Sequence, residues 1–407
     1  MLSMMHCGFL VGFLCLAPWR LIGAGPEVIS QLEYRKANAS IRCESVAAAA
    51  DGSMWLLVST QSIGPDGKNV GPEEKELWRL NPDSERVLEV PVENLTQRDR
   101  PGDKISEVFG IAAESDGALA LLGRNADGRL TLLLVGQSGK ALVRKTLDKG
   151  DRSVYITRLL VSSDGLLTAV GRLDTQGFAL TMQRNGEGQS EYTVRDRDLT
   201  VLKDAVGFGM GELVAVGESL SADGKEVRLS VSRLAPGGEV RAKVVFPDPA
   251  GLEARIASDG RGAYIVAYSS LDPSNKAPIL RVRRLDASLS LTGSLNVPRI
   301  IPYTPVPWLG RNDGELLIAR PDGFHALKLL WLTRDGRVQQ TKDLPAPNVP
   351  NLLQELDVNS YLAAQPGGFA VIETVTAVVR DPERDKISGR GIIRVVKFGE
   401  SAKHPDL

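Results

Sequence analysis

The chain has 407 residues, of which 49 are basic and 50 are acidic, for a formal net charge of −1. This balance, without a Lys/Arg run interleaved with aromatic residues, argues against nucleic acid as a ligand. Three histidines and three cysteines are too few for a His-rich zinc site or a Cys-His-Asn catalytic apparatus. The 41 glycines and 23 prolines would interrupt long helices repeatedly, so they favour an all-β chain.

An apolar run, Cys7–Ala17, stands near the N-terminus and is followed by Pro18. It is shorter than the roughly 20 residues that span a bilayer. Its length, and the small residues at 23–25, fit a signal peptide, although no Lys or Arg precedes the run. We therefore expect residues 1–25 to be a signal peptide of a secreted or periplasmic protein without a membrane span. The alternative is a buried N-terminal helix. Cleavage would leave one cysteine, Cys43, whose apolar context predicts an inert buried thiol.

A short phrase of small residues, a Gly-centred turn and an alternating apolar run returns seven times. Asp-Gly between two such runs predicts a hairpin, because a tight primed turn needs positive φ. The seven glycines recur at intervals of 46 to 65 residues, close to the period of β-propeller blades. They are Gly52, Gly117, Gly165, Gly211, Gly260, Gly314 and Gly368.

A second pair of strands follows each phrase. Period-two alternation, as in Val227–Leu234, is typical of a half-exposed strand. Two hairpins per period give four antiparallel strands, which is one propeller blade. Further strands of this kind are expected at Glu76–Leu80, Leu130–Val135 and Ala326–Leu332, with turns at 81–82, 138–139, 236–238 and 335–336.

The seventh unit has room for only three strands of its own. After Gly399 the remaining residues are too few and too polar for a fourth. Val28–Tyr34 alternates correctly, so we expect this N-terminal segment to complete the last blade and hold the termini together. Residues 26–407 then form one seven-bladed β-propeller, whose closed ring leaves few sheet edges free. We expect a monomer.

The repeats resemble those of bacterial secreted β-propeller proteins. The resemblance rests on residues 162–172, where a strand ends in Val-Gly, and on 178–187, where an apolar strand leads to Asn-Gly. It extends over nearly the whole mature chain. It implies the fold and not an activity, because propellers host many functions.

Sequence motifs for catalysis are missing. There is no Gly-x-Ser-x-Gly, phosphate-binding loop or His-Glu-x-x-His, and His325 is the one histidine outside the signal and the C-terminal tail. No cofactor is expected. Calcium is the one ion left open, since Asp-Gly and Asp-Pro loops supply oxygen ligands, although no loop has the acids of an EF-hand.

The residues at the end of each second strand are the candidate ligand site, because they lie opposite the Asp-Gly turns and could surround the channel mouth. Arginine and glutamate there could bind a carboxylate, a phosphate or a sugar; the alternative is that they are solvated and pair with each other. Trp308, in a Pro-rich segment, adds aromatic surface. The ring is Ser59, Arg124, Arg172, Glu218, Tyr268, Arg320 and Glu373.

Residues 60–75 and 374–390 are predicted to be the longest loops on this face, and with 93–104 to form one raised sector across the first and last blades. We expect a non-catalytic, extracytoplasmic scaffold that binds a protein or carbohydrate partner through this face. The alternative is a hydrolase or lyase acting on a sugar or lactone. It would use Arg124, Arg172 and Arg320 with Glu218 or Glu373, and its acids would have to converge in a dry cavity.

Overall fold

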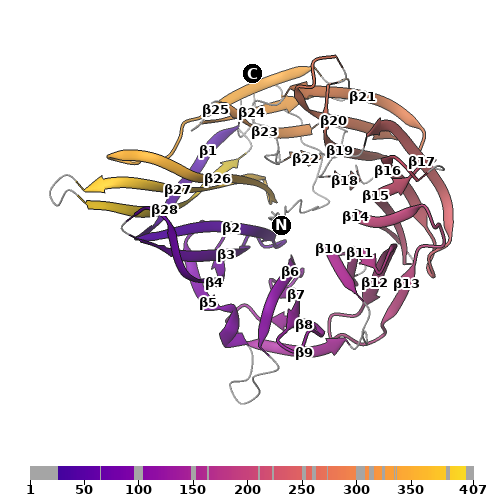
Figure 1. Ribbon diagram of the computed structural model, residues 1–407, viewed down its shortest axis with the longest axis horizontal. Helices are drawn as coiled ribbons and strands as arrows, with labels where there is room; N and C mark the ends of the chain where they lie inside the picture. The colour runs from indigo at the N-terminus through magenta and orange to yellow at the C-terminus, as the bar shows by residue number, and fades with distance from the viewer. Residues whose placement is uncertain are drawn as a thin grey trace, which may run out of the picture.

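Seven four-stranded antiparallel sheets surround a common centre in the computed structural model (Figure 1), as the repeats predict. The described residues are 26–64, 66–95, 104–147, 153–162, 165–209, 211–221, 224–249, 254–258, 263–272, 274–298, 308–310, 316–322, 326–333, 335, 337–381 and 386–399.

The first six blades each use four consecutive strands, ordered from the centre outward. Blades 1 and 2 are β2 (Ala39–Ala48), β3 (Met54–Ile63), β4 (Asn69–Leu80) and β5 (Arg86–Pro91), then β6 (Ile105–Ala113), β7 (Leu119–Asn125), β8 (Leu130–Val135) and β9 (Ala141–Leu147). Blades 3 and 4 are β10 (Val154–Val161), β11 (Leu167–Leu173), β12 (Gln176–Met182) and β13 (Ser190–Thr193), then β14 (Leu199–Gly209), β15 (Glu212–Leu220), β16 (Val227–Leu234) and β17 (Val240–Pro249). Blades 5 and 6 are β18 (Ala254–Ser258), β19 (Tyr264–Leu271), β20 (Pro278–Leu285) and β21 (Leu291–Pro298), then β22 (Trp308–Gly310), β23 (Leu316–Asp322), β24 (Ala326–Leu332) and β25 (Val338–Leu344). One 3₁₀ turn, η1 (Val92–Leu95), follows blade 1.

Blade 7 combines the two ends of the described chain. Its inner strands are β26 (Leu352–Gln365), β27 (Gly368–Asp381) and β28 (Lys386–Gly399), and its outermost strand is β1 (Glu27–Ala37). β1 runs antiparallel to β28, from Glu27 opposite Gly399 to Ala37 opposite Arg390. The predicted closure of the ring by the N-terminal strand is therefore confirmed.

β1 is also held against blade 1. The hydroxyl of Tyr34 donates to the carbonyl of Ser84 at 2.5 Å. The Arg86 guanidinium lies 4.2 Å from the centroid of Trp78 and 5.3 Å from that of Tyr34, an arrangement that favours cation–π attraction. The closing strand is thus fixed by side chains of the neighbouring blade as well as by its own ladder.

Where the turns are described, the first and second strands of a blade meet in hairpins as predicted, although the turn type differs in blade 1. The turns expected at Gly260 and Gly314 lie outside the described residues. In blade 1 the N–H of Gly52 bonds to the carbonyl of Ala49, and the N–H of Ala49 bonds to that of Ser53. Gly52 has φ of 83°, whereas Asp51 has no positive φ. This fits a three-residue loop with glycine in the left-handed position, not a primed turn. Asp51 instead accepts the Ser53 N–H at 2.8 Å.

The hydrophobic core lies between blades. Leu57 and Val58 of β3 pack in one cluster with Leu121 of blade 2 and Ile372 of blade 7. Trp331 of blade 6 packs with Phe369 and Phe398 of blade 7, whose rings stack 4.8 Å apart. Each blade is therefore covered on both faces by its neighbours, which is how a chain of this length avoids needing a single large core.

Candidate functional site

The prediction of long loops at 60–75 and 374–390 is wrong, because both segments are mostly strand. β3 and β4 leave only residues 64–68 between them, and β27 and β28 leave only 382–385. The three strands β26, β27 and β28 have 14 residues each, against seven for β7 and β11. The β27–β28 hairpin extends beyond the ring (Figure 1).

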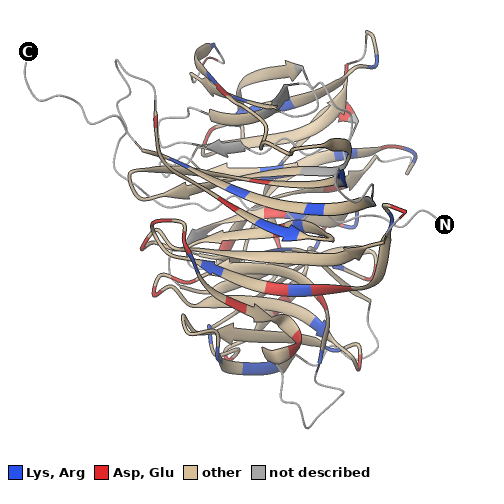
Figure 2. Ribbon diagram, turned by 90° about the vertical axis from the view of Figure 1, so that its left-hand side faces the viewer, with Lys and Arg blue, Asp and Glu red and all other residues tan. Residues whose placement is uncertain are grey.

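We call these extended parts of blades 1 and 7 the raised wall; it comprises residues 60–75, 352–358, 374–381 and 386–391. The Asp51-Gly52 turn of blade 1 and the Pro366-Gly367 turn of blade 7 lie at the opposite ends of the same strands; in blade 7 Gly367, and not the predicted Gly368, has positive φ. The two sheets face the viewer in Figure 2, where basic and acidic residues of both blades are interspersed along them. The part of the predicted raised sector that blades 1 and 7 contribute is therefore present, built from strands and not from loops. Of its third segment, 93–104, residues 96–103 lie outside the described residues.

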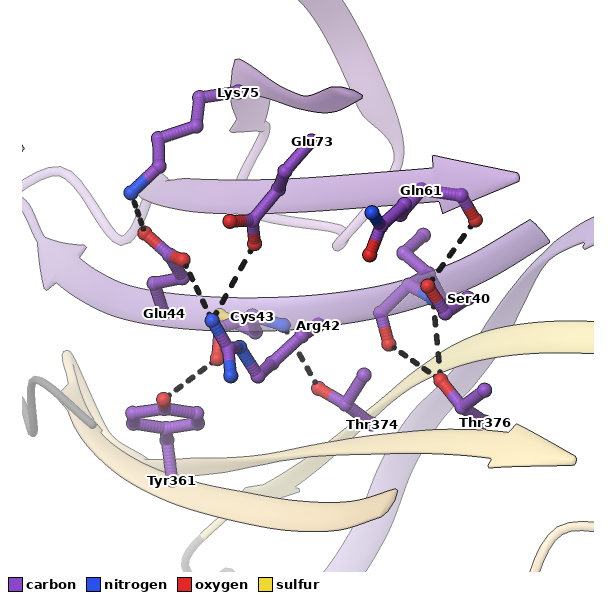
Figure 3. Close-up of polar contacts among 11 residues, drawn as sticks. Ser40, Arg42, Cys43, Glu44, Gln61, Glu73, Lys75, Tyr361, Thr374 and Thr376 are labelled. Atoms are coloured by element: carbon purple, nitrogen blue, oxygen red, sulfur yellow. Dashed lines mark hydrogen bonds and ion pairs between the residues drawn. The ribbon is translucent and has the colours of Figure 1, made fainter. Parts of the chain in front are cut away.

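Hydroxyl groups of blade 7 hold the two sheets of the wall together. Thr374 Oγ1 accepts the N–H of Cys43 at 3.2 Å, and Thr376 Oγ1 accepts the N–H of Ile41 at 3.2 Å (Figure 3). The Tyr361 hydroxyl donates to the carbonyl of Cys43 at 2.6 Å. These contacts satisfy buried backbone groups of the innermost strand of blade 1. Cys43 itself is buried, as predicted.

Two glycines of β28 let blade 7 approach blade 1 closely. A Cβ on Gly391 would lie 2.3 Å from Cγ2 of Ile41, and one on Gly389 would lie 2.2 Å from Cδ1 of Ile63. Both distances are shorter than a real Cβ tolerates. We call this contact between β28 of blade 7 and β2 and β3 of blade 1 the seam. It depends on the absence of a side chain at both glycine positions.

A row of four charged side chains lies across β2 and β4 (Figure 3). Arg42 lies 3.0 Å from Glu44 and 3.4 Å from Glu73, and Lys75 lies 2.8 Å from Glu44. Two positive and two negative side chains pair with each other in this row, so its net charge is zero. The row therefore presents both signs of charge without a strong electrostatic potential of either sign. Such a row suits recognition by a polar surface better than acid–base chemistry.

Large aliphatic side chains are exposed near the free end of the wall. Val70 is 46% exposed, Leu353 53% and Ile387 42%. Val378 and Ile63, on the same strands of the wall as Ile387's partner Arg380 and Val70's neighbour Ser62, are buried. None of the large exposed apolar residues in the described part of the wall is aromatic. The end of the wall thus exposes aliphatic side chains among polar and charged ones.

Three predicted ring residues are partly or fully exposed and engaged within or between neighbouring blades. Arg124 donates to the Val154 carbonyl of blade 3 at 2.9 Å and lies 3.4 Å from Glu107. Arg172 lies over the ring of Tyr155. Glu218 pairs with Lys203 at 2.7 Å. Among the described contacts, none joins two members of the predicted ring.

Three other ring members, Ser59, Tyr268 and Glu373, are buried. Tyr268 donates to Asp248 at 2.8 Å across the junction of blades 4 and 5. Burial and this bond raise its pKa. Glu373 pairs with Arg394 inside blade 7.

The backbones of Arg320 and Trp308 belong to β23 and β22, but their side chains lie outside the described residues. A role for any of these residues in ligand binding stays a prediction.

Replacing Glu373 with glutamine is expected to remove a pH dependence of stability. Burial raises the pKa of Glu373 to about 7, and the Arg394 guanidinium opposes that shift. Because the folded protein holds this proton more tightly than the unfolded chain, the contribution of Glu373 to stability is greatest below pH 4.5, is lost as pH rises toward 7, and then levels off. Urea unfolding between pH 5 and 8 measures the slope, expected to be of order 1 kcal/mol per pH unit. Exposed Glu226, replaced with glutamine, is the control. Equal profiles for wild type and Glu373→Gln would contradict the assignment.

Sequence reasoning missed a buried cluster around Asp248. Arg283 lies 2.6 Å and Arg281 3.3 Å from its carboxylate, and both arginines are buried. The signal was available as alternating arginines in Ile279–Leu285, an otherwise apolar strand. Its partner, however, is on the outermost strand of another blade, which spacing alone does not reveal.

Metal ligands and membrane spans are not seen in the described part of the chain. No three His, Cys, Asp or Glu side chains among the described residues are grouped as a cation would require. No described helix has the length and apolar character needed to cross a bilayer.

Comparison with known proteins gives structural similarity only. The chain matches no protein-family model, and no curated protein is significantly similar to it. Among solved structures it is similar to the WD40 domain of Toxoplasma gondii coronin, at 9% identity over 94% of this chain and 90% of that chain, with a TM-score of 0.49. The β-propeller domain of the Trilobed protease from Pyrococcus furiosus gives 8% identity, 83% and 92% coverage and a TM-score of 0.48. YCF48 bound to D1 peptide gives 12% identity, 98% and 100% coverage and a TM-score of 0.48. At these identities the similarity concerns the fold alone.

Proposed function

We propose that this protein is a non-catalytic, extracytoplasmic binding scaffold that contacts a protein partner through the raised wall. The observation that carries the proposal is the exposed aliphatic end of the wall, formed by Val70, Leu353 and Ile387 beside the compensated charged row. An apolar centre with a polar surround is the usual composition of a protein interface. The extracytoplasmic address rests on the apolar run and the small residues near the N-terminus.

A protein suits this surface better than a carbohydrate. Carbohydrate recognition relies on exposed aromatic faces and dense hydrogen-bonding groups, whereas the large exposed apolar residues of the described wall are aliphatic. The catalytic alternative has no comparable support. The buried acid Glu373 is enclosed within blade 7, and Arg124 is already bonded to blade 3.

Aspartate at both Val70 and Ile387 is expected to weaken partner binding by at least tenfold, because it places charge in the apolar centre of the interface. The partner is first identified by placing a photo-crosslinking residue at position 70 or 387 of the full chain in its native host. The same adduct is expected from both positions. Affinity for the purified partner is then compared between wild type and the double variant.

The matched control uses Leu142 and Val338, which are 59% and 55% exposed on the outer strands of blades 2 and 6. Aspartate at these two positions should leave the affinity unchanged, and a crosslinker there should not give the adduct. Adducts that form equally well from the control positions, or full affinity in the wall variant, would overturn the proposal.

A further inference from the structure

Three charged side chains from the innermost strands of blades 3, 4 and 5 gather on one side of the channel. They are Arg158 on β10, Asp204 on β14 and Arg255 on β18, and we call them the channel cluster. In Figure 1 these three strands are the ones of their blades that lie nearest the centre of the ring. The innermost strands of a propeller surround its central channel, so the cluster belongs to the channel and not to the raised wall.

The one carboxylate of the cluster is already engaged. Asp204 Oδ2 accepts the backbone N–H of Ile256 on β18 at 3.1 Å, and Oδ1 lies 3.4 Å from Nε of Arg158. The Asp204 side chain is buried, so its position is set by these two contacts. Asp204, on blade 4, thus contacts both blade 3, through Arg158, and blade 5, through Ile256. Its carboxylate is already paired with Arg158.

Arg255 has no carboxylate of its own among the described residues. Its Nη1 contacts the carbonyls of Lys203 and Ala254, each at 3.4 Å, which is long for a hydrogen bond to a guanidinium. Its Nε is buried and has no hydrogen-bond partner in the described structure. The neighbouring Glu218 does not serve it, because that carboxylate pairs with Lys203 at 2.7 Å.

The positive charges of the cluster lie close enough to affect each other. Burial is the larger cause that lowers the pKa of Arg158, to about 10; the nearby charge of Arg255 lowers it further, and Asp204 opposes both. A guanidinium donates up to five N–H bonds in a planar fork that matches carboxylate and phosphate oxygens. Because Nε is buried, an anion in the channel would be met by the terminal Nη nitrogens of Arg255, whose two contacts are long. A half-buried arginine with so few hydrogen bonds, beside a second arginine, is suited to an anionic group.

We propose that the channel cluster is a binding site for an anionic group, a carboxylate or a phosphate, carried by a ligand that enters the channel. Arg255 donates to the anion directly, and Arg158, held in place by Asp204, adds favourable charge. The channel cluster and the raised wall share no residue and would bind different ligands. Failure of the scaffold proposal would therefore leave this proposal untouched, and the reverse also holds.

Thermal unfolding and isothermal titration of the purified protein test the site. The probes are inorganic phosphate and succinate, each compared with sodium chloride at equal ionic strength. We expect at least one probe to raise the unfolding temperature saturably, because a ligand bound only to the folded state stabilises it. Phosphate alone would indicate a phosphate ligand, and succinate alone a carboxylate.

Arg255→Gln is expected to weaken binding of that probe at least tenfold. The matched control is Arg337→Gln, which removes an arginine that is 85% exposed between β24 and β25 and belongs to neither the cluster nor the predicted ring. Phosphate stabilises many proteins through exclusion from their surface, so only the difference between the two variants counts. Arg255→Lys keeps the charge but loses the fork, and should bind more weakly than wild type.

If Arg255→Gln does not fold, probe binding is compared between wild type and Arg255→Lys instead. A saturable shift that persists unchanged in the Arg255 variant that folds, or no shift beyond that of sodium chloride in wild type, would overturn the proposal.

Discussion

Replacing Asp248 with alanine is expected to lower the free energy of unfolding by about 3–5 kcal/mol. This carboxylate accepts from Tyr268 and pairs with Arg283 and Arg281, and both arginine side chains are nearly enclosed. Removing the Asp248 carboxylate leaves two buried guanidinium groups without their carboxylate acceptor. The free-energy cost of these uncompensated buried charges is larger than the loss of the ion-pair attraction alone. Denaturant unfolding of the purified variant measures the change.

The same carboxylate should make the blade 4–5 junction sensitive to acid. Burial pushes the pKa of Asp248 upward, but the hydrogen bonds from Tyr268 and Arg283 and the two positive charges outweigh it, so the pKa is lowered. A lowered folded-state pKa adds stability above the ordinary carboxyl pKa, and that stability is lost as pH falls through the lowered value. The wild type should therefore lose more stability below about pH 4 than the alanine variant does.

Asp343 provides the control for this prediction. It lies 3.5 Å from Lys328, and its side chain is 73% exposed. Asp343→Ala should cost less than about 1 kcal/mol, because exposed ion pairs contribute little. Equal losses for the Asp248 and Asp343 variants would show that Asp248 is not a buried anchor.

Replacing Gly391 with alanine is expected to cost about 1–3 kcal/mol, the usual penalty for an extra methyl in a packed interface. The new Cβ would lie 2.3 Å from Cγ2 of Ile41 and 3.0 Å from its backbone nitrogen, so β28 and β2 would have to separate. Because this seam joins the last blade to the first, the strain acts on closure of the ring. Thermal unfolding measures the loss.

Gly293→Ala is the matched control, since a Cβ there would meet the Arg284 side chain at an ordinary 3.5 Å. A second test combines Gly391→Ala with Ile41→Ala, which removes the methyl at 2.3 Å and leaves only Cβ, at 2.7 Å, and the backbone nitrogen. The double variant should lose less than the sum of the two single losses, because the residues are in contact. Strict additivity would contradict a steric cause.

The sequence was sufficient to predict the blades, because each Gly-centred turn is followed by an alternating strand pair. It was sufficient for ring closure too, since Val28–Tyr34 had no other blade to join. The wall was misjudged as loops because Gly71, Pro72 and Gly389 interrupt the apolar alternation. In the structure the two β28 glycines are strand residues that allow two sheets to touch.

The candidate site was less predictable for a geometric reason. Inner strands carry irregularities, such as the register shift between Ile156 and Arg158 in β10, which change the direction of the side chains that follow. The partners of Asp248 and Asp204 lie on other blades, and no local pattern encodes such pairs. Residue identity at the end of a second strand therefore does not determine which side chains meet.

Closure by β1 has a consequence for biosynthesis. Glu27 and its partner Gly399 are separated by about 370 residues, so β1 is made long before the strand that pairs with it. Until β28 has emerged, Val28 and Ile29 lie on a strand without a sheet, and the growing blades form an open arc with bare edges. Such late, long-range pairing is slow and prone to aggregation. A chain that stalls before β28 lacks the strand that β1 pairs with, so its ring stays open.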